Sequence, residues 1–158
     1  MIYTRVYFPV GCEFLTCHNK LMPADGMYRF ADADIQELIR ESATVRENSY
    51  SPYSKFKVGA AVRCADGSIS RGCNVENASF PAGVCAETTA IARAVSEGKQ
   101  KFTALAVVAD QESTTFTTPC GVCRQFMSEF GDNIPIYLSR TDMKKVLRTK
   151  VNFFYVLN

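Results

Sequence analysis

The chain has 158 residues, of which 47% are hydrophobic and 22% are charged. This length is typical of one domain with a continuous hydrophobic core, and the composition is that of an ordinary globular protein. The net charge of +2 is too small to predict nucleic-acid binding, and the apolar runs are too short to predict a membrane span. We therefore expect neither a nucleic acid nor a membrane as a partner.

The chain has seven cysteines, an odd number that a complete disulfide framework would not use up. The opening residues lack the basic start and the small-residue cleavage site of a secretory signal. We therefore expect a reducing, cytoplasmic location. In such a compartment, spaced cysteines are better interpreted as metal ligands or reactive thiols than as bridges.

Residues 1–30 mix Pro, Gly and aromatic side chains without a steady period. We predict a poorly ordered N-terminal extension there and a single domain over residues 31–158. A transit peptide is the weaker interpretation, because the segment has few arginines and little serine. Cys12, Cys17 and His18 also lie in this segment, but they lack a recognised partner pair for a metal site.

The first regular element expected in chain order is a helix from Asp34, where Asp34 and Glu37 have the spacing of a capping box. Two strands are predicted next, over residues 56–64 and 68–75. The residues Ala65-Asp66-Gly67 between them are a hairpin turn signal. The pattern therefore predicts a helix followed by a β-hairpin.

Helices and strands alternate in the second half of the chain. The pattern predicts a helix over 85–97, an apolar strand over 102–109, a helix over 120–130 and a strand over 134–138. Both helices are followed by a glycine that can end them. A last segment from Lys144 is expected to be extended. This order predicts an α/β fold with helices on the faces of a sheet.

Cysteines begin both of these later helices. Cys120 and Cys123, in "TPCGVCRQF", lie one turn apart, and Cys85 starts the other helix. The positive end of a helix lowers a thiol pKa and favours the thiolate that a metal requires. If the two helix starts converge, three thiolates would leave one tetrahedral position of a zinc ion open, which indicates catalysis. Glu87, in the first turn after Cys85, could reach a water on that metal without being a ligand.

Each of these pieces has a simpler interpretation when it is taken alone. A C-x-x-C pair is more often half of a structural zinc site or a redox pair. A glutamate in the first turn of a helix usually interacts with the helix dipole. The combination of "CAE" with a later "PCGVC" is more specific, because it is the signature of zinc deaminases with cysteine in place of histidine.

On these motifs, and on "YSPYSKFKVGAAV" and "GCNVENASFPAGVCAE", the chain resembles the cytidine deaminase family over residues 35–138. The resemblance is to the small type with three cysteine ligands. It implies a three-layer α/β/α sandwich with a central mixed sheet of about five strands, assembled as a homotetramer. It also implies one zinc ion per chain on Cys85, Cys120 and Cys123, with Glu87 as the catalytic residue.

The activity implied by the resemblance is hydrolytic deamination of cytidine and deoxycytidine to uridine and deoxyuridine, a step of pyrimidine salvage. In that reaction zinc activates a water, and Glu87 carries protons to the ring and to the departing ammonia.

The resemblance also implies a set of substrate-binding residues. Asn74 and Glu76 would hold the ribose hydroxyls, and Phe56 would stack near the base. An amide and a carboxylate at i and i+2 on a strand point to one face, which suits a sugar, although a solvated strand end is the simpler interpretation. The full set is Phe56, Asn74, Val75, Glu76, Asn77, Ala78, Ser79, Phe80 and Ala86.

The chain departs from the family pattern at Thr88, where the resemblance implies an arginine that hydrogen-bonds the ligand sulfurs. Three thiolates around a zinc dication leave about one net negative charge, so we expect reduced activity or a compensating donor, for which Arg124 is a candidate. The C-terminal "TKVNFFYVLN" also differs from the family. Phe153 or Phe154 would either complete a neighbouring site or belong to a buried terminal strand.

Three other functions remain open on the sequence. The chain could deaminate another pyrimidine-like nucleoside, or it could be a non-catalytic zinc-binding module whose fourth ligand is Cys73. It could also be a thiol redox protein. Cys64 and Cys73 are most simply interpreted as core thiols of the two hairpin strands. A polynucleotide substrate is disfavoured, because a residue that clamps the ribose 3′ hydroxyl would collide with a 3′ phosphate.

Overall fold

The structure is a computed structural model that describes residues 27–28, 33–110 and 116–151. The predicted extension lies outside these residues, apart from Met27–Tyr28, which form the short strand β1. The other residues of the sequence analysis that lie outside the described part are Cys12, Cys17, His18, Phe153 and Phe154.

A single mixed sheet forms the centre of the molecule, with the strand order β1-β6-β5-β4-β2-β3. Strands β4 and β5 run parallel, and the other neighbours are antiparallel. The predicted mixed sheet of about five strands is confirmed, with two-residue β1 added at the edge beside β6. The five longer strands are β2 (Val58–Cys64), β3 (Ile69–Cys73), β4 (Phe102–Ala109), β5 (Pro135–Arg140) and β6 (Val146–Lys150).

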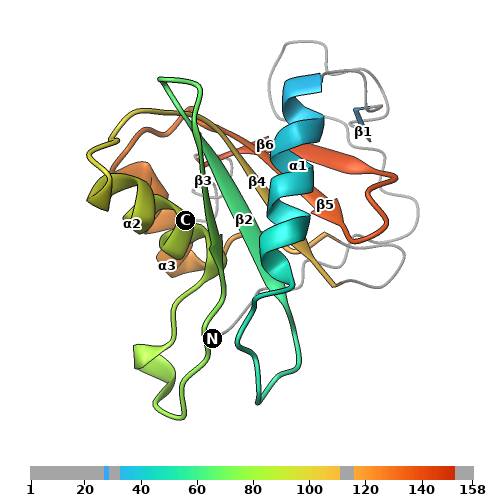
Figure 1. Cartoon of the computed structure of the whole chain (residues 1–158), viewed down its shortest axis with the longest axis vertical. Coiled ribbons are helices and arrows are strands. Elements are labelled where there is room, and N and C mark those ends of the chain that lie inside the picture. The colour runs from blue at the N-terminus through green and yellow to red at the C-terminus, as the bar shows by residue number, and fades with distance from the viewer. Residues whose placement is uncertain (1–26, 29–32, 111–115, 152–158) are drawn as a thin grey trace, which may run out of the picture.

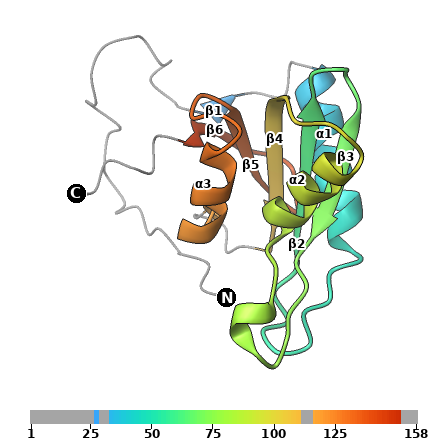
Figure 2. The ribbon, with the colours of Figure 1, turned by 90° about the vertical axis from the view of Figure 1, so that its left-hand side faces the viewer.

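Helices cover both faces of the sheet. Helix α1 (Ala33–Arg46) lies on one face, and α2 (Ala86–Ser96) and α3 (Gly121–Ser128) lie on the other (Figures 1 and 2). The three-layer α/β/α sandwich is therefore confirmed. At 14 residues α1 is the longest helix in the described part of the chain, well short of the about 20 residues that a bilayer requires.

Two strand glycines allow the helices to approach the sheet closely. A Cβ atom at Gly59 of β2 would lie 2.0 Å from the carbonyl oxygen of Ser42 in α1. A Cβ atom at Gly72 of β3 would lie 2.3 Å from the backbone nitrogen of Ala90 in α2. Each glycine therefore sets the distance between the sheet and the helix on one of its faces.

The hydrophobic core has two parts, one on each face of the sheet. The part beneath α1 includes Leu38, Ile39 and Val108. The part beneath α2 and α3 is larger, and it contains Cys85, Cys120 and Cys123 among its buried residues. The three cysteines of the predicted metal site are thus packed inside the core.

The strand directions bring distant segments to one end of the sheet. Because β2 and β3 are antiparallel, the start of β2 lies beside the end of β3, where Gly59 faces Cys73. The end of β4 joins them, since Val58 faces Ala109. Isolated bridges from Val75 to both Tyr50 and Val84 then hold the neighbouring loops together. The loops beyond this end form the lower tip in Figure 1, and the chain leads from them into α2 through its N-cap, Cys85.

Candidate active site

The three predicted metal ligands lie together at the starts of two helices. Cys85 is the N-cap of α2, and Cys120 is the N-cap of α3. Cys123 lies in the first turn of α3, and its side chain is fully buried. The Sγ atom of Cys120 is 3.7 Å from that of Cys85 and 3.6 Å from that of Cys123.

These sulfur distances fit a tetrahedral zinc ion. Zinc–thiolate bonds of about 2.3 Å in tetrahedral geometry separate the sulfurs by roughly 3.8 Å. Among the described residues, Cys85, Cys120 and Cys123 are the group of His, Cys, Asp and Glu side chains that could hold a metal ion. Cys73 does not belong to that group, which disfavours a closed four-cysteine site. A three-thiolate site leaves one coordination position for another ligand.

The thiols also share protons in a way that suits metal binding. Hydrogen bonds from Cys123 and then Cys85, together with backbone N–H groups of α3, lower the pKa of Cys120. The hydrogen bond with Cys120 is the main cause that raises the pKa of Cys85 and of Cys123. A cation replaces such shared protons when it binds, because metal ligation releases protons from thiols.

Glu87 lies beside the thiols with a buried carboxyl group. Its side chain is 1% exposed, and neither carboxyl oxygen has a hydrogen-bond partner among the described residues. Burial, and secondarily the charge of Cys120, raise the pKa of Glu87 to about 7. A buried polar group without a partner requires an explanation, and a shifted pKa in a buried site is typical of functional residues.

Thr88 supplies a contact to the thiol cluster. Its Oγ1 atom lies 3.7 Å from the Sγ atom of Cys123. The next residue, Thr89, instead donates its hydroxyl to the backbone oxygen of Cys85 at 3.0 Å. The position where the chain departs from the family pattern therefore places a neutral hydroxyl group beside one of the sulfurs, and this hydroxyl donates when the sulfur is a thiolate.

Asn74 is fully buried at the end of β3. Its Oδ1 atom accepts hydrogen bonds from the Ser49 hydroxyl at 2.5 Å and from the Val58 backbone at 2.9 Å. Its amide nitrogen donates to the backbone oxygen of Phe56 at 2.9 Å. The amide thereby fixes the segment before β2 against the end of β3, and its predicted contact with a sugar stays a prediction.

Glu76 is half-buried, and its carboxylate accepts hydrogen bonds from residues of the turn before β2. The backbone nitrogens of Tyr53 and Ser54 donate to its Oε2 atom at 3.0 and 3.1 Å, and the Ser54 hydroxyl donates to Oε1. Burial alone would raise the pKa of Glu76, but these hydrogen bonds, that of the Ser54 side chain first, lower it overall. Glu76 is therefore a carboxylate with a fixed position.

The other predicted substrate residues surround the entry to α2. Phe56 is half-buried against the core, and Ala86 is fully buried. Phe80 is 71% exposed at the start of the 3-10 helix η1 (Phe80–Ala82). The segment between β3 and η1 is mostly exposed, and it contains Val75, Asn77, Ala78 and Ser79.

Comparison with known proteins identifies the family. The family model described as the cytidine and deoxycytidylate deaminase zinc-binding region matches residues 32–138, more than half of the chain. The chain belongs to this family.

Curated members of the cytidine deaminase family are similar to the chain in sequence. The cytidine deaminase of Sporosarcina psychrophila is 50% identical over 107 residues, which cover 67% of this chain and 77% of that protein. The cytidine deaminase of Halalkalibacterium halodurans is 51% identical over 96 residues, covering 61% and 71%.

Solved cytidine deaminases share the fold. The crystal structure from Burkholderia pseudomallei is 40% identical, with a TM-score of 0.70, and the match covers 75% of this chain and 93% of that one. The crystal structure from Mycobacterium tuberculosis is 31% identical, with a TM-score of 0.66 and coverage of 80% and 97%.

Sequence reasoning did not single out the residues that hold the predicted substrate contacts in place. Ser49 and Ser54 bond Asn74 and Glu76 across more than 20 residues of sequence. The run "SPYS" does predict a turn, because Pro and Ser favour turns. The backbone N–H groups of such a turn need hydrogen-bond acceptors. The run indicates a turn but does not name Glu76 as the acceptor.

Proposed function

We propose that the chain is a zinc-dependent hydrolase that deaminates cytidine and deoxycytidine to uridine and deoxyuridine. The observation that carries the proposal is the cluster of three buried sulfurs at zinc-ligand spacing, next to the buried carboxyl group of Glu87. Membership of the cytidine deaminase family, and relatives named for that activity, support the same reaction.

Two groups of residues have different roles in the proposed reaction: the cysteines hold the metal, and Glu87 transfers protons. Cys85, Cys120 and Cys123 would hold zinc, which supplies the Lewis acidity that makes water a nucleophile at neutral pH. Glu87 is placed next to the thiols, where the two oxygens of its buried carboxyl group make no hydrogen bond to another described residue.

Glu87 is the general acid and base of the proposed reaction. With a pKa raised to about 7, its carboxyl group can both accept and release a proton near neutral pH. It takes a proton from the attacking water and delivers it to N3 of the cytosine ring. A second proton follows to the amino group at C4, which leaves as ammonia. Water and cytidine are thereby converted to uridine and ammonia.

We propose that the nucleoside binds at the end of the sheet opposite the β2–β3 turn. We propose that Glu76 and Asn74 recognise the ribose and that Phe56 packs near the base. The fixed carboxylate of Glu76 supports this role, because a sugar hydroxyl is a suitable donor to it. The exposed residues 75 and 77–80 would line the substrate, together with the backbone at Ala86.

We further propose that the chain assembles as a homotetramer. Several large apolar side chains are exposed on the single chain, among them Phe80 at 71% and Val122 of α3 at 71%. Val122 lies beside Phe126 and Phe130 in a shallow apolar depression along α3. Exposed apolar patches of this kind are typical of interaction surfaces, and light scattering can compare the mass in solution with the 17.5 kDa of one chain.

The proposed biological setting is pyrimidine salvage in the cytoplasm. The five described cysteines are free thiols, which supports a reducing compartment. The proposed domain occupies residues 31–158, and strand β1 (Met27–Tyr28) of the preceding extension 1–30 pairs with its sheet.

Replacement of Glu87 by glutamine tests the function. Incubation of the purified protein with cytidine should produce the ultraviolet change of conversion to uridine, with one zinc per chain. Glu87→Gln should retain that zinc, since the carboxyl group is no ligand, while kcat falls by at least about a hundredfold.

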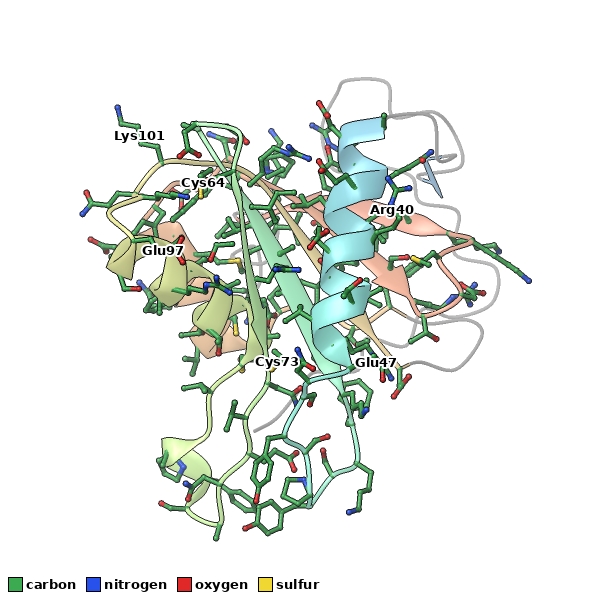
Figure 3. All side chains as sticks on the ribbon, in the orientation of Figure 1. Arg40, Glu47, Cys64, Cys73, Glu97 and Lys101 are labelled. Atoms are coloured by element: carbon green, nitrogen blue, oxygen red, sulfur yellow. The ribbon has the colours of Figure 1, made fainter. Side chains whose placement is uncertain are left out.

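Glu97→Gln is the matched control, because Glu97 caps the other end of α2 (Figure 3) and pairs with Arg93 on the surface. Its turnover should equal that of the unmodified protein. A zinc-loaded protein that leaves both cytidine and deoxycytidine unchanged would refute the proposed function. Loss of zinc from Glu87→Gln would instead refute the assignment of its role.

A further inference from the structure

We propose that Ser54 is a positioning residue that orients the carboxylate of Glu76 toward one sugar hydroxyl and joins it to Phe56. The inference rests on the proposed function and deepens it. It concerns a residue that neither contacts the metal cluster nor belongs to the predicted substrate set.

The direction of the hydroxyl bond of Ser54 follows from its two partners. The backbone nitrogen of Phe56 donates to the Ser54 Oγ atom at 3.0 Å. Oγ also contacts Oε1 of Glu76, and an ionised carboxylate can only accept. The hydroxyl proton of Ser54 must therefore point at Glu76, so one side chain links the backbone of Phe56 to the carboxylate.

The remaining bonds leave little freedom to Glu76. Its Oε2 atom accepts from the backbone nitrogens of Tyr53 and Ser54, and its Oε1 atom accepts from the Ser54 hydroxyl. A carboxylate has about four lone-pair directions, so three bonds leave about one, on Oε1. A carboxylate held in this way is presented to a single further donor, such as one ribose hydroxyl.

The turn that carries Ser54 is itself fixed on both sides. Lys55 has a φ of 58°, a left-handed conformation that residues other than glycine keep only where the surroundings hold them. Its backbone nitrogen donates to Ser51 at 3.1 Å. On the other side, the backbone oxygen of Phe56 accepts from the buried amide of Asn74. Ser54 thus connects the carboxylate to a turn that hydrogen bonds hold on both sides.

Ser54→Ala tests the inference through the split between KM and kcat. Loss of one charge-assisted hydrogen bond should raise the KM for cytidine about tenfold and weaken binding of the product uridine by a similar factor. The value of kcat and the zinc content should not change, because Glu87 and the thiols are untouched. Ser54→Thr keeps the hydroxyl and should restore the KM.

Sugar analogues identify the hydroxyl that is recognised. The effect of Ser54→Ala should disappear with either 2′-deoxycytidine or 3′-deoxycytidine, whichever lacks the hydroxyl that Glu76 contacts. In a Glu76→Gln background, Ser54→Ala should add little, since both changes remove the same interaction.

Ser68→Ala is the matched control. The Ser68 hydroxyl donates to Oδ1 of Asp66 at 2.6 Å, so it makes the same kind of bond in the hairpin turn at the far end of β2 and β3. It should leave KM and kcat at the values of the unmodified enzyme.

The outcomes separate the inference from the proposed function. In an enzyme that deaminates cytidine, a KM within twofold of normal for Ser54→Ala would overturn the role of Ser54. An equal rise for every analogue, or a fall in kcat with KM unchanged, would also overturn it. An unmodified protein that does not deaminate cytidine refutes the proposed function first, and uridine affinity then still reports on the sugar site.

Discussion

At the scale of single residues, the main electrostatic feature of the site is the negative charge that the three thiolates, Cys123 among them, carry inside the core. Three thiolates around a dication leave about one net negative charge inside the core, where solvation is weak. The hydroxyl of Thr88 lies 3.7 Å from the Sγ atom of Cys123, and the charge of Glu87 also acts on this thiol. A neutral donor offsets less of the net negative charge than an arginine would.

Substitution of Thr88 tests this balance. Thr88→Val has nearly the same shape but lacks the donor, so turnover should fall about tenfold and zinc should be lost at a lower chelator concentration. Thr88→Arg should raise turnover at neutral pH, because a cation compensates the excess negative charge. The measurements are kcat for cytidine and the fraction of zinc retained across a chelator titration.

Thr89→Val serves as the control, since Thr89 follows in the same helix turn but bonds the backbone oxygen of Cys85 and not a sulfur. Its kcat and zinc retention should match those of the unmodified protein. Unchanged kcat and zinc retention in both Thr88 variants would show that the hydroxyl does not affect the sulfurs.

At the scale of elements, the site depends on where the helices begin relative to the sheet. Cys85 and Cys120 are both N-caps, so their sulfurs meet because the starts of α2 and α3 meet at one end of the sheet. Helix α2 packs closely on Gly72 of β3. A Cβ atom at this position would lie 2.6 Å from the backbone oxygen of Ala86, in the first turn of the helix. The position of the ligand Cys85 is therefore coupled to a strand glycine.

The variants Gly72→Ala and Gly59→Ala together distinguish an effect on the free energy of unfolding from an effect on zinc affinity. Each adds a methyl group between the sheet and one helix, so each should lower the free energy of unfolding by about 1–3 kcal/mol. Only Gly72→Ala displaces α2, and it alone should weaken zinc binding. Denaturant unfolding of the zinc-loaded proteins, together with a competitive zinc titration, measures the two effects.

The assignment of α2 to the metal site would be wrong if both variants lost zinc affinity equally. Gly59 provides the contrast because its methyl group would collide with Ser42 and Arg46 of α1, on the opposite face of the sheet.

The long elements could be predicted from the sequence because each has its own periodic pattern. Strand β4 has the predicted bounds, and α2 and α3 each begin one residue after the predicted start, since their cysteines are caps. Helix α1 begins at Ala33, so Asp34 lies in its first turn and not at the predicted cap. These differences are confined to element ends, where helical periodicity gives no signal.

The short elements and the polar network could not be predicted. Strand β1 has two residues, too few to show alternation, and it depends on pairing with Val146 and Leu147 of β6. The 3-10 helix η1 is a single turn. The thiol cluster was predictable because three cysteines in a known signature define it, whereas the bond from Ser54 to Glu76 depends on a turn geometry that sequence spacing does not encode.

For the whole molecule, the three sulfurs join two helices that approach the sheet from separate stretches of the chain. Cys85 belongs to the start of α2 and Cys120 to the start of α3, with all of β4 between them in sequence. A metal ion bound to these sulfurs acts as a cross-link in the core. Because the unfolded chain does not present this group in place, binding to the folded state adds directly to stability.

Removal of zinc should therefore lower the melting temperature. At a free zinc concentration about a thousand times Kd, binding contributes about 4 kcal/mol, which corresponds to roughly 10 °C for a chain of this size. Calorimetry with and without chelator measures the difference, and added zinc should restore it. Cys123→Ser should abolish the response, whereas Cys73→Ser should retain it, since Cys73 lies outside the ligand group. A melting temperature that does not change after measured loss of zinc would mean that α2 and α3 are held by the core alone.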